Sequence, residues 1–190
     1  MQRGVISLKK YEEIKGGTLM ERPGIVTRRG NPLTLLGPEL KVGEAAPDFE
    51  VIDNNLLTVR FSSFRGKICL IASVPSLDTP VCDIETRRFN TEAGRLSPDI
   101  QIMTISMDLP FAQKRWCGAA GVDKVITLSD HKDASFGMAY GVLIKELRLL
   151  ARAVFVVDRQ GIIRHIQIVK EQTEEPDYEK VLGIVKELTQ

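Results

Sequence analysis

The sequence predicts a single α/β domain of three layers, with a short β-hairpin at its N-terminal end. Two observations support this fold class: short apolar runs alternate with amphipathic segments through the middle of the chain, and two strand-like segments followed by a helix close it. The chain has 190 residues, 43% hydrophobic and 27% charged, which suffices for one sizeable core. We therefore expect one domain over residues 25–190.

The N-terminal part of the chain precedes this domain. Residues 1–24 mix charge with glycine and proline and show no sustained periodicity, so we interpret them as an extension and assign it no function. Segments 25–28 and 33–36 are strand-like and enclose a turn-forming sequence. This pattern predicts a hairpin with its turn at Gly30 and Asn31.

The central segments predict buried strands joined by helices. Residues 68–72, 100–107 and 124–128 are short apolar runs, which is typical of strands covered on both faces. Helical segments are expected between them at 83–95 and 110–120. The resulting order is β-α-β-α-β.

The C-terminal third closes the sheet. Apolar stretches at 147–157 and 162–169 flank a turn ending in Gly161 and predict an antiparallel hairpin. Segment 177–188 predicts a helix with one apolar face, formed by Tyr178, Val181, Leu182, Val185 and Leu188. The whole order is compatible with a thioredoxin-like core. A fold alone decides no chemistry.

Charge and hydropathy exclude some classes of partner. The formal net charge is +1, which offers no broad attraction to nucleic acid or to anionic lipid. No apolar run approaches the roughly 18 residues that cross a bilayer, and the charged start lacks the apolar stretch of a signal peptide. We expect a cytoplasmic protein that binds neither nucleic acid nor membrane.

The cysteines indicate thiol chemistry. Cys69, Cys82 and Cys117 are too far apart in the sequence for a secreted disulfide framework, and His131 and His165 are too distant for a zinc site. We therefore expect reactive thiols in a reducing compartment, with no metal and no other cofactor.

Cys82 occupies the position best suited to a reactive thiolate. It follows the predicted buried strand 68–72 and opens a predicted helix, where free backbone N–H groups and the helix dipole favour a negative charge. Such junctions are where α/β sheets bind ligands. The dipole contributes only about 0.3 to 1 kcal/mol, so a nearby cation is needed as well.

Four further residues are candidates, and the residues alone leave the role of each open. Arg152 interrupts an apolar run, so it is either a buried cation in need of a partner or the outward residue of an edge strand. Thr79, three residues before Cys82, could bond its sulfur or merely cap the helix. Pro75 and Pro80 could hold the loop over the sulfur or be ordinary turn prolines.

Cys69 is flanked by Ile68, Leu70 and Ile71 in a strand, so we expect an unreactive buried thiol. We expect His131 and His165 at the surface or in helper roles, because a thiolate needs no separate base.

At these residues the sequence resembles the peroxiredoxins, whose pattern of Pro, three residues, Thr or Ser, two residues and Cys is matched by Pro75, Thr79 and Cys82. It is most similar to the bacterial thiol peroxidases, the atypical two-cysteine subfamily. The resemblance runs from about residue 25 to the end. Supporting segments are the hairpin around residues 30–32 and stretches 106–113, 115–118, 125–129, 151–154 and 175–178. Trp116 departs from the family, which more often has Phe there.

The resemblance implies roles for the candidates. Cys82 is then the peroxidatic cysteine, Cys117 the resolving cysteine, and Thr79, Pro75 and Arg152 surround the reacting sulfur. The resemblance thus favours Arg152 as a cation in the active site over Arg152 as the outward residue of an edge strand. A Cys82 sulfenic acid would condense with Cys117 to an intramolecular disulfide, and the two forms would differ in backbone conformation.

The resemblance also implies hydrogen peroxide and organic hydroperoxides as substrates, thioredoxin as the reductant, and a homodimer. A thioredoxin-like disulfide reductase is a poor alternative, because no second cysteine lies near Cys82 in a C-x-x-C arrangement. A redox-switched binding or chaperone module with incidental peroxide reactivity is a second alternative that the sequence leaves open.

Overall fold

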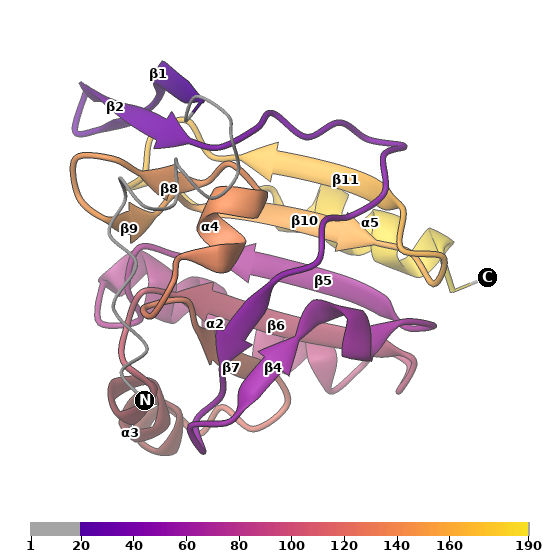
Figure 1. Ribbon diagram of the computed structural model, residues 1–190. Helices are drawn as coiled ribbons and strands as arrows, with labels where there is room; N and C mark the ends of the chain where they lie inside the picture. Colours follow the sequence, from indigo (N-terminus) through magenta and orange to yellow (C-terminus); the bar gives the residue numbers. More distant parts are fainter. Residues whose placement is uncertain (1–19, 190) are drawn as a thin grey trace, which may run out of the picture.

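A computed structural model describes residues 20–189 and contains a seven-stranded mixed sheet (Figure 1). Its strand order is β11-β10-β5-β6-β7-β3-β4. β5, β6 and β7 run parallel, and the other neighbours pair antiparallel. The strands are β3 (Glu50–Ile52), β4 (Thr58–Arg60), β5 (Ile68–Ser73), β6 (Ile100–Ser106), β7 (Ile126–Ser129), β10 (Ala153–Val157) and β11 (Ile163–Ile168).

A smaller antiparallel sheet has the order β1-β2-β8-β9. It consists of β1 (Glu21–Arg28), β2 (Asn31–Leu36), β8 (Leu143–Ile144) and β9 (Leu149–Leu150). The N-terminal hairpin therefore pairs with a segment more than a hundred residues away. This pairing brings the hairpin over the region that precedes β10.

Helices complete three layers around the large sheet. They are α2 (Pro80–Ala93), α3 (Pro110–Ala120), α4 (Ser135–Ala139) and α5 (Tyr178–Glu187), with a 3-10 helix η1 at Phe61–Phe64. Side chains of α2, α5 and the end of α3 share one apolar cluster with the sheet, whereas α4 and the small sheet share the other. In Figure 1, α2 and α5 lie behind the large sheet and α4 lies in front.

The two faces of β5 explain its continuous apolar sequence. Ile68 and Leu70 pack toward α2 and α5, and Cys69 and Ile71 pack toward α4. All six residues of β5 are buried. A central strand covered on both faces requires this pattern, so the sequence prediction for this strand is confirmed.

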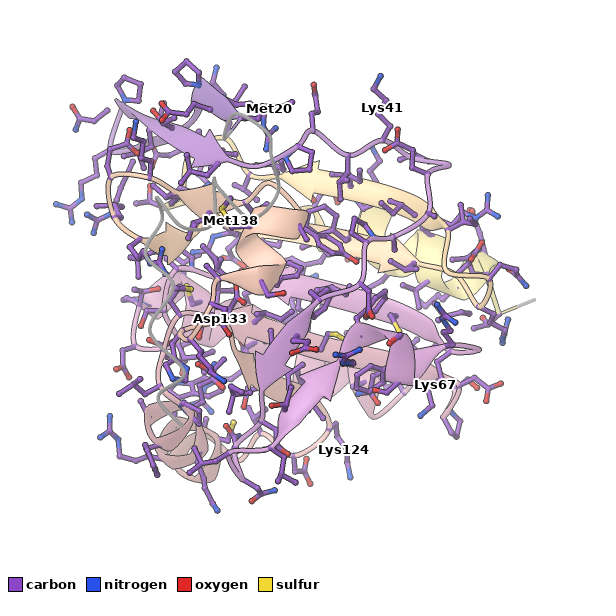
Figure 2. All side chains as sticks on the ribbon, viewed as in Figure 1. Met20, Lys41, Lys67, Lys124, Asp133 and Met138 are labelled. Carbon is purple, nitrogen blue, oxygen red and sulfur yellow. The ribbon has the colours of Figure 1, made fainter. Side chains whose placement is uncertain are left out.

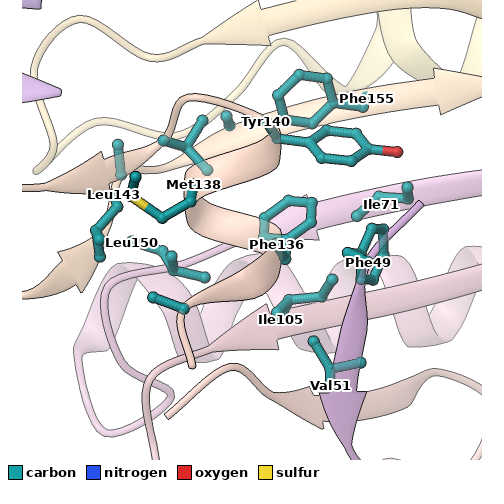
Figure 3. Close-up of a cluster of buried hydrophobic side chains, with 14 of the residues drawn as sticks. Phe49, Val51, Ile71, Ile105, Phe136, Met138, Tyr140, Leu143, Leu150 and Phe155 are labelled. Atoms are coloured by element: carbon teal, nitrogen blue, oxygen red, sulfur yellow. The ribbon is translucent and has the colours of Figure 1, made fainter. Parts of the chain in front are cut away.

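Aromatic side chains fill the space between α4 and the large sheet (Figure 3). The ring centroids lie 5.0 Å apart for Phe49 and Phe136, 4.6 Å for Phe136 and Tyr140, and 5.0 Å for Tyr140 and Phe155. Aromatic pairs at these distances stabilise a core beyond their buried area. The cluster anchors α4, and with it the start of β8, against β10.

The surface follows the expected division of side chains. Figure 2 shows Met138, a residue of α4, inside the fold, whereas Lys41 and Lys124 project at the periphery. Among residues 20–189, no helix is long and apolar enough to cross a membrane.

The structure confirms the predicted class and the N-terminal hairpin, and it corrects the hairpin's bounds. β1 begins at Glu21 and contains an irregularity between Pro23 and Val26, so the last part of the predicted extension is strand. Residues 1–19 of that extension lie outside the described residues. The turn is Arg29-Gly30 rather than the predicted Gly30-Asn31, since Asn31 already pairs with Arg28. Both turn residues have positive φ (51° and 78°), as a type I′ hairpin requires.

The structure also corrects the apolar stretch 147–157. It forms two strands in different sheets, β9 and β10, separated at Arg152. Since β10 lies between β11 and β5, an edge strand with an outward Arg152 is wrong. The sequence patterns predict none of five short elements, which are β3, β4, η1, α4 and β8. Short elements of this kind carry too few residues for a periodic signal.

Gly141 tests how tightly α4, β8 and the hairpin are joined. It has φ +65°, and a Cβ there would collide with the carbonyl oxygen of Pro38 and the guanidinium of Arg22. We expect Gly141→Ala to reduce the free energy of unfolding by about 2 kcal/mol more than Gly161→Ala does. Gly161 also has positive φ (+81°), but its Cβ would meet open space, so only the conformational penalty of roughly 1 to 2 kcal/mol applies. Urea unfolding measures both; equal losses would contradict the close contact.

Candidate active site

The loop that connects β5 to α2, at the carboxyl edge of the sheet, is held by hydrogen bonds to one carboxylate. Asp108, just beyond the end of the parallel neighbour β6, accepts hydrogen bonds from Ser76 Oγ and Leu77 N, both at 2.8 Å. Ser106 Oγ donates to the same carboxylate at 2.8 Å. One carboxylate thus ties the loop to the adjacent strand and positions the start of α2.

Cys82 lies in the first turn of α2 and is completely buried. Thr79 occupies the N-cap position and Pro80 begins the helix, where its missing N–H and fixed φ are well tolerated. The Thr79 side chain makes no capping bond. Its Oγ1 instead lies 2.7 Å from Cys82 Sγ and 3.1 Å from the Ser76 carbonyl oxygen, so its single proton can be donated to either.

Arg152 supplies a cation to the same sulfur. Its side chain is 1% exposed, and Nη2 lies 3.4 Å from Cys82 Sγ. The site therefore contains one buried sulfur with a hydroxyl donor and a guanidinium donor. Both groups stabilise a sulfur that carries negative charge.

Glu85 is the counter-ion of Arg152. It follows Cys82 by one helical turn, is fully buried, and accepts a hydrogen bond from Arg152 Nη1 through Oε2. Burial raises the pKa of Glu85 to about 7, and the positive charge of Arg152 opposes that rise. Glu85 Oε1 has no hydrogen-bond partner within residues 20–189, which is compatible with a carboxyl that holds a proton readily.

Gln172 and its neighbour Glu171 connect Arg152 to the hairpin turn. Its Oε1 accepts from the Arg152 N–H, and its carbonyl oxygen accepts from Nη2 at 3.2 Å. The neighbouring Glu171 accepts from the N–H groups of Arg29 and Gly30 at 2.9 and 3.1 Å. These bonds lower the pKa of Glu171 to about 2. The hairpin turn is therefore joined through segment 171–172 to the guanidinium.

A cavity of about 390 Å³ lies against this site. Thr79 and Arg152, the two side chains that contact the sulfur, line it together with Pro75. Its other lining residues are Arg28, Arg29, Ser76, Pro80, Val81, Ile144, Leu147, Leu149, Gln172 and Thr173. Aliphatic side chains of the β8–β9 region thus face the reacting centre, and the cavity has the size of a small-molecule site.

Cys117 lies near the end of α3 and has separate neighbours. Its sulfur is partly buried and lies 3.3 Å from Thr127 Oγ1 of β7. Cys82 and Cys117 are both free thiols in this structure. The two helices that carry them, α2 and α3, pack on the same side of the sheet.

The remaining candidates lie outside the site. Cys69 is buried in β5, and burial raises the pKa of its thiol to about 12, as expected for an unreactive cysteine. His131 is bonded to Ser129 at 2.8 Å. His165 lies in β11 and is buried, which corrects the expectation of a surface position. No group of three or more His, Cys, Asp or Glu suited to a metal ion occurs in residues 20–189.

Comparison with known proteins identifies the family. The model of the Redoxin family matches residues 41–182, about three quarters of the chain. The chain belongs to the redoxin family. The matched range includes every residue that contacts the sulfur of Cys82. Of the helices and strands within residues 20–189, only β1, β2 and the end of α5 extend beyond it.

Relatives within the redoxins share most of the chain. A thiol peroxidase from Bacillus subtilis is 55% identical over 86% of this chain and 97% of its own length. One from Oceanobacillus iheyensis is 57% identical over 83% of this chain and 96% of its own length. The crystal structure of a peroxiredoxin-like protein from Aquifex aeolicus superposes with a TM-score of 0.82 at 42% identity, covering 90% and 99% of the two chains.

Of the five predicted site residues, four lie together in this redoxin and Cys117 has separate neighbours. Thr79 and Arg152 each contact Cys82, and Pro75 lines the adjoining cavity. The sequence alone did not indicate Glu85, Asp108 or Gln172 as parts of the site. A signal existed for Glu85, since a buried arginine requires a counter-ion and Glu85 lies three residues after Cys82, on the same face of the predicted helix. Gln172 gave no comparable signal.

The Glu85–Arg152 pair predicts a pH dependence of stability. The folded-state pKa of Glu85, about 7, exceeds the unfolded value of 4.5, so the folded state retains a proton that the unfolded state releases in this window. The contribution of Glu85 to stability is therefore full below pH 4.5 and is lost as the pH rises toward 7. We expect the free energy of unfolding of the parent, relative to Glu85→Gln, to fall by up to about 3 kcal/mol over this window.

Denaturant titrations of both proteins from pH 4.5 to 7.5 test this expectation. Glu85→Gln retains an amide oxygen for the bond from Arg152, so its packing is matched to that of the parent. Parallel stability profiles for the two proteins would show that Glu85 titrates normally.

Proposed function

We propose that this redoxin is a thiol-dependent peroxidase in which Cys82 is the peroxidatic cysteine and Cys117 the resolving cysteine. One observation carries the assignment: Thr79 Oγ1 and Arg152 Nη2 converge on a single buried sulfur, at 2.7 and 3.4 Å, at the start of a helix. The thiol peroxidase relatives support the activity, since they match more than four fifths of the chain at over half identity.

In the first step, the Cys82 thiolate attacks the terminal oxygen of a hydroperoxide, the one that carries hydrogen, and the O–O bond breaks. The sulfur becomes a sulfenic acid, and the departing oxygen takes up a proton to leave as water or an alcohol. Arg152 and Thr79 are positioned to stabilise the negative charge that develops on the departing oxygen. No metal or organic cofactor is needed for this step.

In the second step, the thiol of Cys117 attacks the sulfenic acid. An S–S bond forms, the S–O bond breaks, and the hydroxyl group leaves as water with the thiol proton. A disulfide requires Cα atoms within about 7 Å, so the first turn of α2 has to unwind to release the buried Cys82. The reduced and disulfide forms are therefore expected to differ in backbone conformation around both cysteines.

The cavity supports organic hydroperoxides as substrates besides hydrogen peroxide. Ile144, Leu147 and Leu149 offer an apolar wall beside Thr79 and Arg152, where the alkyl part of a hydroperoxide can rest. The enzyme requires a thiol reductant to reopen the disulfide. We propose thioredoxin for this role, together with a homodimeric, cytoplasmic enzyme, on the basis of the family resemblance.

A redox-switched binding or chaperone module is not favoured. The relatives that cover nearly the whole chain are named as peroxidases, and the contacts around Cys82 stabilise the reacting centre itself.

Three serine substitutions test the cysteine assignments. With a thioredoxin system, we expect Cys82→Ser to consume no peroxide, because the nucleophile is lost. Cys117→Ser should lose turnover yet consume about one equivalent of peroxide, since a sulfenic acid still forms on Cys82. Cys69→Ser serves as the matched control and should keep turning over. Sustained turnover by Cys82→Ser would rule out the mechanism.

Thr79 provides a test of the hydroxyl donor that is separate from helix stability. Thr79→Val keeps the shape of the side chain but removes the donor, and we expect the rate constant for the first oxidation to fall about 100-fold. Thr79→Ser, which keeps the hydroxyl, should stay within about fivefold of the parent. Because the Thr79 side chain makes no capping bond, both variants should unfold at similar denaturant concentrations. Equal oxidation rates would remove Thr79 from the mechanism.

A further inference from the structure

Trp116 lies at the junction between the surroundings of the two cysteines. Its indole packs against the small cluster formed by Val74, Leu77 and Cys82. The same side chain, together with Cys117, also packs against the larger cluster under α2 and α5. It thus contacts both apolar clusters, the one that contains Cys82 and the one against which Cys117 packs.

Polar contacts hold this indole in place. Trp116 Nε1–H donates to Asp83 Oδ1 at 3.1 Å, and Arg87 Nε donates to Asp83 Oδ2 at 2.9 Å. Arg87 Nη1 also donates to the Ala120 carbonyl oxygen at 2.6 Å, and its guanidinium lies 5.8 Å from the centre of the Trp116 ring. We call these four residues the α2–α3 clasp.

The position of the clasp along the chain links it to the cysteines. Asp83 directly follows Cys82, and Trp116 directly precedes Cys117. The bond between Asp83 and Trp116 therefore joins the two chain neighbours of the reacting residues. Neither the first turn of α2 nor the end of α3 can move far from its present place while this bond persists.

We propose that the α2–α3 clasp sets the rate at which Cys117 reaches the sulfenic acid of Cys82, with Asp83 and Trp116 as positioning residues for the resolving step. The inference rests on the function proposed above. In the reduced state Cys82 Sγ faces Thr79 and Arg152, whereas Cys117 Sγ faces Thr127. A bond of about 2 Å between the sulfurs requires the indole to leave its place.

The clasp also decides the fate of the sulfenic acid. While the clasp is closed, a second hydroperoxide can react with the sulfenic acid, giving a sulfinic acid on Cys82 and releasing water or an alcohol. Opening of the clasp directs the same intermediate to the disulfide. A weaker clasp should therefore speed resolution and protect the enzyme against excess peroxide.

Trp116→Phe and Asp83→Ala test the proposal from both ends of the bond. Each removes the hydrogen bond, and Phe keeps an aromatic ring in the cluster. After one equivalent of hydrogen peroxide, we expect disulfide formation to be about fivefold faster than in the parent, the factor for one partly exposed hydrogen bond. The first oxidation should stay within about twofold. Quenching and mass spectrometry measure the disulfide, and the sulfinic acid formed with excess peroxide should decrease in parallel.

Asp83→Asn is the matched control. It removes the charge of Asp83 near the start of α2 but keeps an oxygen that can accept from Trp116 Nε1–H. Disulfide formation should therefore remain close to the parent rate. The sequence contains one tryptophan, so the fluorescence of Trp116 follows clasp opening directly in both Asp83 variants.

The outcomes separate this inference from the proposed function. Unchanged or slower disulfide formation in Trp116→Phe and Asp83→Ala overturns the clasp while leaving the peroxidase intact. The same holds if Asp83→Asn accelerates resolution as much as Asp83→Ala, because the charge would then be responsible. Failure of the parent to oxidise Cys82, or to link it to Cys117, refutes the proposed function instead.

Discussion

The buried contact between Arg152 and Cys82 is the interaction on which the rest of the site depends. The guanidinium of Arg152 is 1% exposed, and burying it costs free energy unless its charge is paired and its N–H groups are hydrogen-bonded. Glu85 supplies the counter-charge and Gln172 accepts from the backbone and from Nη2. Nη2 also donates to the sulfur of Cys82 at 3.4 Å, whereas Nε has no hydrogen-bond partner within residues 20–189.

One positive charge is thus shared between two acidic groups, Glu85 and Cys82. Burial raises the pKa of Glu85 to about 7, so this carboxyl supplies its counter-charge only in part at neutral pH. The charge of Arg152 is then available to a thiolate on Cys82, and later to the oxygen that departs from the hydroperoxide. Burial of Arg152 costs free energy, but it also strengthens the interaction of its charge with the sulfur, because electrostatic interactions are stronger in a medium of low dielectric constant.

The fold holds this arrangement from three directions. Asp108, at the end of β6, accepts hydrogen bonds from the loop before α2. Glu171, next to Gln172, accepts hydrogen bonds from the turn of the hairpin. The clasp between Asp83 and Trp116 joins α2 to α3. The first two stabilise the geometry for attack on the peroxide. In the proposed resolving step the bond between Asp83 and Trp116 has to open. Its side chains are partly exposed and lie at helix ends, where local opening costs little free energy.

The sequence by itself determined the class of fold and the order of its main elements, and it indicated the candidate reacting residues. Continuous apolar runs such as 68–72 predict buried strands, and Cys82 at a strand-to-helix junction with Thr79 three residues earlier indicates the reacting sulfur. Only the tertiary structure showed that Arg152, at the point where the chain passes from the small sheet to the large one, is 1% exposed. It alone brought Glu85, Gln172 and the hairpin turn together. Periodicity reports which face of one element is buried, whereas these partners are set by pairing between strands far apart in the chain, which no local pattern records.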